Sequence, residues 1–127
     1  AREEKDKGSI IVIVATDLPV TERQLNRIIK RSVTGLSRTG STIANGSGEV
    51  VIGFSTATKI PHQKPSHLLS IPMIHVEDMD IAFRAVGEAT EEAVLNSLVT
   101  ATRVSGRDGN ERLAFKDVVE EYNIELG

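Results

Sequence analysis

The hydrophobic pattern of the chain begins abruptly at Ser9, where an apolar run replaces a charged segment. Residues 9–16, with the sequence SIIVIVAT, are mostly β-branched and do not alternate with polar positions. A continuous run of this kind is typical of a strand covered on both faces in the middle of a sheet. Residues 49–57, with the sequence EVVIGFSTA, predict a second buried strand.

The segment between the two predicted strands has apolar residues at the spacing of a helix. Thr21 and Gln24 stand at the spacing of a capping box, which predicts the start of a helix. The pattern predicts a single helix running on to Leu36, followed by a turn-rich stretch over residues 37–48. Its apolar stripe consists of Leu25, Ile28, Ile29, Val33 and Leu36.

The second half of the chain predicts a long loop and two helices. Residues 58–75 hold three of the four prolines and should form a loop with one short extended piece at 68–74. A long helix should follow, from Asp78 or Asp80 to about Arg103, with a turn at 106–109. A last helix at 115–122 should point Phe115, Val118, Val119 and Tyr122 inward.

This order of elements predicts an α/β (α+β) fold with too few strands to close a sheet. We expect either an oligomer formed through the sheet or the C-terminal part of a larger protein. The 127 residues suffice for one domain, and with 39% hydrophobic residues the chain should bury a core. Residues 1–8 are charged and should form a linker.

Composition excludes several classes of function. The net charge of −3 and the 3% aromatic content argue against a nucleic-acid partner, and the absence of Cys excludes a thiolate metal site or nucleophile. The longest apolar run, Ile10–Ala15, is far shorter than the ~20 residues of a membrane-spanning helix. We therefore expect no membrane partner and a cytoplasmic protein. The basic side chains at 23–31 should form a solvated helix face, or else contact an acidic surface.

The Gly8-Ser9 step could be a self-cleavage site. A serine hydroxyl can attack the carbonyl that precedes it, and Gly8 puts no side chain in the way. Hydrolysis of the resulting ester would free an α-amine, which titrates near neutral pH and can act as a base. The alternative is a linker glycine followed by the first residue of a strand.

The motif Asn45-Gly-Ser-Gly-Glu49 is the second candidate for chemistry. Ser47 and Glu49 are two residues apart, so in an extended chain their side chains point to the same side and the carboxylate could orient the hydroxyl. The alternative is a hairpin turn at Asn-Gly with Glu49 in solvent.

We expect His62, His67 and His75 to be polar loop residues and not metal ligands, because nothing fixes them near Glu77 or Asp78.

These motifs and three others resemble the family of L-aminopeptidases/D-esterases and β-peptidyl aminopeptidases, often called the DmpA family. The further stretches are Gly35-Leu-Ser-Arg-Thr-Gly-Ser41, Gly53-Phe-Ser-Thr-Ala57, and Ala89-Thr-Glu-Glu-Ala93 through Gly106-Arg-Asp-Gly109. They extend from Gly8 nearly to the end of the chain. The resemblance implies part of a four-layer αββα sandwich of the N-terminal-nucleophile type, with residues 9–127 as the C-terminal subunit.

The resemblance also implies a function and its residues. The bond between Gly8 and Ser9 would be cleaved by the precursor itself, Ser9 would be the nucleophile, and Ser47 and Glu49 would complete a relay. The substrate would be a short peptide, amide or ester, and no metal or organic cofactor is implied. The partner would be the larger N-terminal subunit, which supplies the oxyanion-stabilising groups, within a homo-oligomer. We therefore expect the 127-residue chain alone to be inactive.

Two alternatives to this function remain open. The chain could be a non-catalytic α/β module for binding or assembly. It could also be a self-processing acyltransferase, although the Thr nucleophile of that pattern is absent at position 9.

Overall fold

The computed structural model describes residues 8–127, which form two compact units. The first unit ends at Glu91 and the second comprises Glu92–Gly127. Seven of the eight residues of the predicted linker, 1–7, lie outside the described residues. No helix within residues 8–127 is long and apolar enough to cross a membrane.

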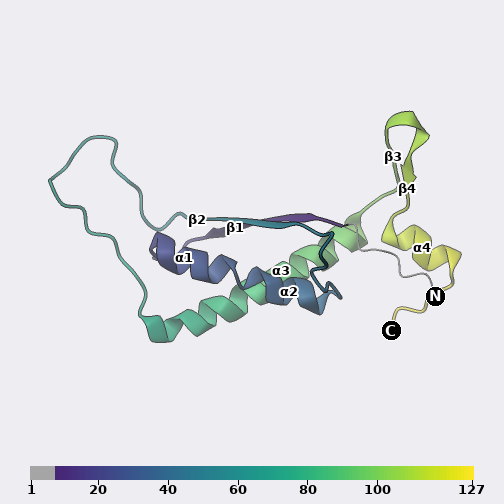
Figure 1. Ribbon diagram of the computed structural model, residues 1–127, viewed down its shortest axis with the longest axis horizontal. Coiled ribbons are helices and arrows are strands. Elements are labelled where there is room, and N and C mark those ends of the chain that lie inside the picture. Colours follow the sequence, from purple (N-terminus) through teal and green to yellow (C-terminus); the bar gives the residue numbers. More distant parts are fainter. Residues whose placement is uncertain (1–7) are drawn as a thin grey trace. The chain divides into compact units, whose positions relative to one another are not determined.

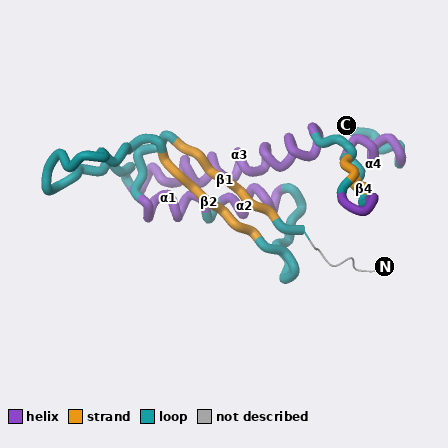
Figure 2. The backbone as a smooth tube through the Cα atoms, turned by 90° about the horizontal axis from the view of Figure 1, so that it is seen from above, coloured by secondary structure: helices purple, strands orange, loops and turns teal. Residues whose placement is uncertain are grey.

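The first unit is built on two parallel strands, β1 (Ile10–Thr16) and β2 (Glu49–Ser55), which lie side by side in Figure 2. Their register pairs Ile10 with Glu49 at one end and Thr16 with Ser55 at the other. The helices α1 (Glu22–Ile29) and α2 (Ser32–Arg38) connect them. A connection of this length carries the chain back to the edge where β1 began, which is what a parallel pair requires.

All the helical cover of the first unit lies on one face of the strand pair, as Figure 1 shows for α1, α2 and the beginning of α3 (Met79–Thr100). The core on this side joins α1 to α3 through Val20, Ile28, Met79, Ala82 and Val86, with Val14 of β1 packed against it. Burial of this apolar surface is the main stabilising term for the unit.

The other face of the strand pair is uncovered within the described residues. Both strands alternate between half-buried and exposed positions. On β1, Ile11 and Ile13 are 70% and 67% exposed, and Val50, Ile52 and Phe54 are exposed beside them on β2. The predicted cover on both faces is therefore not met within residues 8–127, because these residues supply only one layer of helices.

The single helix predicted from Thr21 to Leu36 is wrong; the structure has two. Its start is confirmed: Thr21 Oγ1 accepts from Gln24 N at 3.2 Å, and Thr21 N donates to Gln24 Oε1 at 3.3 Å. The break follows α1. There the N–H of Arg31 donates to the Ile28 carbonyl, and the N–H of Thr34 donates to the Arg31 carbonyl. These bonds span three residues instead of four, so the chain tightens and changes course there.

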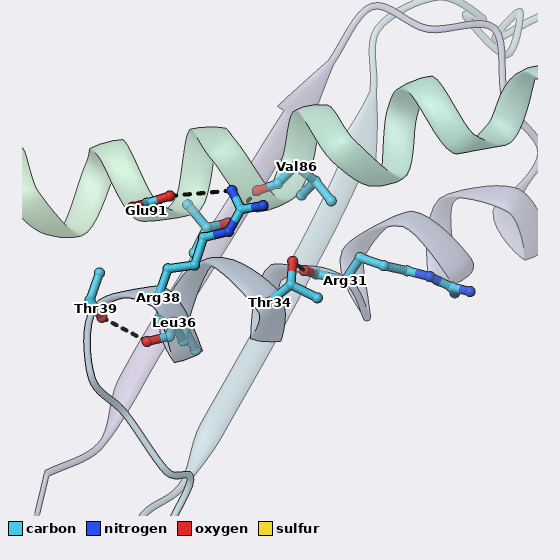
Figure 3. A network of polar contacts seen from close by, with 8 residues as sticks. Arg31, Thr34, Leu36, Arg38, Thr39, Val86 and Glu91 are labelled. Carbon is cyan, nitrogen blue, oxygen red and sulfur yellow. Dashed lines mark hydrogen bonds and ion pairs between the residues drawn. The ribbon is translucent and has the colours of Figure 1, made fainter.

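The close approach of α2 to α3 depends on glycine. A Cβ at Gly35 would lie 2.3 Å from the backbone oxygen of Gly87, so no side chain fits between the two helices. Figure 3 shows the same interface, where Arg38 of α2 forms a 3.3 Å ion pair with Glu91 of α3. The two helices therefore pack backbone to backbone, with polar contacts at the margin.

A long segment, residues 56–75, joins β2 to the 3-10 turn η1 (Val76–Asp78) that precedes α3. It leads away from the strands and returns in Figure 1, and it contains no helix or strand. The predicted loop is thus confirmed, but the short extended piece expected at 68–74 does not form a strand. Its end is fastened to α1, because the buried Gln24 donates from Nε2 to the Ile74 carbonyl at 2.7 Å.

The second unit begins within α3, which ends at Thr100, close to the predicted Arg103. A short antiparallel hairpin follows, formed by β3 (Val104–Ser105) and β4 (Glu111–Arg112) around the turn η2 (Arg107–Gly109). The predicted turn at 106–109 is thus confirmed. Asp108 and Gly109 have positive φ of 58° and 73°, the backbone that such tight turns need.

The last helix, α4 (Phe115–Glu121), forms where it was predicted but does not bury its apolar face as expected. Tyr122 is 69% exposed and Phe115 is also exposed, while Val118 and Val119 are half-buried. The expectation of four inward side chains is wrong within the second unit, which offers them too little apolar surface.

Candidate active site

The two motifs with candidate chemistry meet at one edge of the strand pair. Ser9 directly precedes β1, and residues 45–48 directly precede β2. Because the strands are parallel and start in register, their first residues lie side by side. The backbone seals this junction, since Ile10 N donates to the Gly48 carbonyl at 3.0 Å. Residues 39 positions apart in sequence are thereby brought into contact.

The hydroxyl of Ser9 is held by the backbone of the second motif. The N–H of Gly48 donates to Ser9 Oγ at 3.2 Å, and Ser9 and Gly48 are both exposed. Accepting this hydrogen bond fixes the oxygen and leaves its own proton free to be given to a base. A donor at this oxygen also favours any negative charge that develops on it.

Ser47 and Glu49 form a close pair next to this contact. Ser47 Oγ donates to Glu49 Oε1 at 2.5 Å, and both residues are half-buried. The prediction that the two side chains point to the same side is confirmed. With its proton directed at the carboxylate, the Ser47 oxygen has its lone pairs available for a donor on the other side.

The Asn-Gly step does form a turn, closed by a 2.9 Å hydrogen bond from Ser47 N to the Ala44 carbonyl. It is not a hairpin turn, however, because the strand that follows pairs in parallel with β1. Glu49 is also not free in solvent, since it accepts from Ser47. The alternative in which this motif is only a hairpin turn is therefore wrong.

The relay that the family resemblance implies would bring the side chain of Ser47 to Ser9. Within residues 8–127 the structure shows no hydrogen bond between the side chains of Ser9 and Ser47; the donor to Ser9 is the N–H of Gly48. The sequence pattern did not predict this donor, because glycine has no side chain and was considered only for the space it leaves. The register of β1 against β2, which sets Gly48 opposite Ser9, could have revealed it.

The three histidines do not take part in this arrangement. All are exposed on the segment between β2 and α3. His75 accepts from Glu77 N at 3.2 Å through Nδ1 and so caps η1. Among the described residues no group of three or more His, Cys, Asp or Glu side chains could hold a metal ion.

Comparison with known proteins identifies the family. Residues 1–112 match the model of peptidase family S58, so the chain belongs to this family of peptidases. It is 38% identical over 102 residues to the β-peptidyl aminopeptidase BapA of Sphingosinicella microcystinivorans. That match covers 80% of this chain and 26% of the relative, so the chain spans about a quarter of its length.

Two solved structures resemble the chain closely. The PH0078 protein of Pyrococcus horikoshii OT3 has a TM-score of 0.78 at 41% identity, covering 91% of this chain and 34% of its own. The L-aminopeptidase D-Ala-esterase/amidase of Ochrobactrum anthropi has a TM-score of 0.76 at 33% identity, with the same coverage. The latter is a prototype of the serine aminopeptidases and a variant of the Ntn hydrolase fold. The predicted family and the α/β fold of N-terminal-nucleophile type are thereby confirmed.

Proposed function

We propose that this chain is the nucleophile-bearing part of a self-processing serine aminopeptidase that releases N-terminal residues from short peptides, amides or esters. The observation that carries the proposal is the meeting of Ser9, Gly48 and the Ser47–Glu49 pair at one edge of the strands. Membership of a peptidase family supports it. The substrate class follows the β-peptidyl aminopeptidase and the aminopeptidase/esterase/amidase that the chain resembles.

The first reaction is cleavage of the chain's own Gly8–Ser9 bond. Ser9 Oγ attacks the Gly8 carbonyl carbon and gives up its proton, and the C–N bond breaks as the nitrogen of Ser9 takes a proton. The product is an ester between Gly8 and the Ser9 oxygen. Water hydrolyses this ester, releases the Gly8 carboxylate and leaves Ser9 with a free α-amine and a free hydroxyl.

The second reaction is turnover by the processed protein. Ser9 Oγ attacks the substrate carbonyl while its proton passes to the α-amine of the same residue, and the departing amine or alcohol collects that proton. Water then hydrolyses the acyl ester on Ser9. The amine needs an orienting acceptor, and the Ser47 oxygen can serve, because its own proton is directed at Glu49. Gly48 N–H holds the Ser9 oxygen.

The chain requires a partner, which we propose to be the larger N-terminal portion of the same precursor. The exposed aliphatic face of β1 and β2, with Ile11, Ile13 and Ile52, is a large apolar surface that a second sheet would cover. The partner would also supply the oxyanion donors and the group that holds the substrate amine. The 127-residue chain alone is therefore inactive, and the processed protomers form a homo-oligomer without a metal or organic cofactor.

The test uses the full-length precursor and an acylating serine reagent. Stoichiometric labelling of Ser9 in the processed protein is the expected result. Ser9→Ala should abolish self-cleavage and turnover, and Ser47→Ala should lower both while the protein stays folded. Ser97→Ala is the matched control, because Ser97 is exposed on α3 and bonds only to the Val94 carbonyl. Normal processing of the Ser9→Ala variant contradicts the proposal, whereas the absence of labelling in the properly assembled protein favours a non-catalytic module.

A further inference from the structure

The turn that precedes Ser47 contains an Asn-Gly sequence, Asn45-Gly46, which is chemically reactive and has no role in the proposed peptidase mechanism. Of the five asparagines in the chain, only Asn45 is followed by glycine. Asn45 and Gly46 are both exposed, and within residues 8–127 neither the Asn45 side chain nor the Gly46 N–H has a hydrogen bond. The side-chain amide and the adjacent backbone nitrogen are therefore both open to water and to each other.

We propose that Asn45 is a site of spontaneous deamidation, and that the isoaspartate formed there disables the Ser47–Glu49 pair. The modification is independent of the proposed function; only its effect on activity rests on that function. The chemistry uses water as the single co-reactant and needs no enzyme.

The reaction begins with the backbone nitrogen of Gly46. After losing its proton to base, this nitrogen attacks Cγ of Asn45, and a new C–N bond closes a five-membered succinimide. The bond between Cγ and the side-chain nitrogen breaks, and that nitrogen takes up a proton from water and leaves as ammonia. Gly46 has no Cβ to obstruct the ring closure. Water then opens the ring at one of its two carbonyl carbons. One opening gives aspartate, and the other gives isoaspartate, in which the main chain runs through the former side chain.

Isoaspartate adds a methylene group to the main chain inside a turn of four residues. That turn is closed by the bond from Ser47 N to the Ala44 carbonyl, and it sets Ser47 against Glu49. The next residue, Gly48, holds the Ser9 hydroxyl. A longer main chain at position 45 therefore displaces both contacts at once, whereas ordinary aspartate adds only a charge at an exposed position.

The other four asparagines provide internal controls. Asn26 and Asn96 lie within helices, and Asn110 Nδ2 donates to the Arg107 carbonyl at 3.0 Å. Asn123 is exposed like Asn45, but the β-branched Ile124 follows it and crowds the attacking nitrogen. Their rates of deamidation should all fall well below that of Asn45.

The experiment incubates the full-length processed protein at mildly alkaline pH and maps its peptides by mass against time. We expect the peptide with Asn45 to gain the mass difference between an amide NH₂ and a hydroxyl, and to become a substrate for an isoaspartate-specific methyltransferase. Gly46→Ala should slow this conversion by at least about tenfold, which corresponds to a barrier higher by about 1.4 kcal/mol. Conversion of Asn45 no faster than that of Asn123 overturns the proposal.

Activity, normalised to each variant's starting value, tests the consequence. It should decline in step with isoaspartate in the unsubstituted protein and decline more slowly in Gly46→Ala. Asn45→Asp, which carries the charge without the added methylene, should keep most of its activity. Isoaspartate formation without loss of activity overturns the effect on the Ser47–Glu49 pair, and an inactive starting protein contradicts the proposed function instead.

Discussion

The Ser47 hydroxyl donates a 2.5 Å hydrogen bond to Oε1 of Glu49, the first residue of β2. The direction of this bond decides what the serine can do. Because the Ser47 hydroxyl uses its only proton in the bond to the carboxylate, its oxygen can only accept a hydrogen bond from any further group. A free α-amine on Ser9 is the group that such an acceptor can orient for proton transfer.

Replacing Glu49 by Gln tests the direction of this bond. The amide can donate as well as accept, so the Ser47 hydroxyl is no longer held in one orientation. Self-cleavage and turnover of the full-length precursor should both slow, by roughly 10²- to 10⁴-fold if the relay carries the proton transfer. Glu120→Gln, at an exposed position on α4, is the control. Equal rates in the two variants would contradict the role of Glu49.

Shortening a side chain on the uncovered face of the sheet tests the partner. If Ile13 packs against the larger portion of the precursor, Ile13→Ala should lower the free energy of unfolding by about 2–5 kcal/mol. Ile60→Ala is the control, because Ile60 is 81% exposed on the segment after β2 and should change stability by about 0.5 kcal/mol or less. Urea unfolding of the two full-length variants measures both values. Similar midpoints would mean that the face stays open to water.

Adding one methyl group between α2 and α3 tests their packing. In Gly35→Ala the new Cβ would meet the backbone oxygen of Gly87, which cannot move away cheaply. The free energy of unfolding should fall by about 1–3 kcal/mol. Gly106→Ala is the control, since its Cβ would lie 3.4 Å from the Asn110 oxygen, an ordinary contact. If chemical denaturation finds the two variants equally stable, the backbone contact is not as tight as described.

The buried amide of Gln24 allows a separate test of how the loop is fastened. Gln24→Ala removes the donor to the Ile74 carbonyl and one cap of α1, which should cost about 1–3 kcal/mol of stability. The substitution should also raise the rate of amide hydrogen exchange at residues 74–78, which directly precede α3. Gln63→Ala, on the exposed loop, should change neither quantity. Unchanged exchange in Gln24→Ala would show that the loop is held by other contacts.

The sequence predicted those features that depend on local chemistry or on a strict period. The capping box of Thr21 and Gln24, the two strands and the side shared by Ser47 and Glu49 all follow from spacing along a short stretch. The break after α1 did not, because the apolar stripe continues through it and only backbone bonds spanning three residues reveal it. The contact of Ser9 with Gly48 depends on the strand register, which spacing alone does not give.

Burial was the property least accessible from the sequence. The β-branched run at 9–16 favours a strand with two covered faces, yet the described residues cover only one. The same holds for Phe115 and Tyr122, which are apolar in type but exposed in the second unit. A periodic pattern shows that a face avoids water, but not which chain segment covers it.

Ser9 should become the N-terminal nucleophile of the processed protein. An intact-mass spectrum of the purified full-length protein, with N-terminal sequencing of each species, tests it most directly. We expect two polypeptides, with the smaller one beginning at Ser9, and a single uncleaved polypeptide for Ser9→Ala. A native protein that is active while its Gly8–Ser9 bond remains intact would contradict the claim.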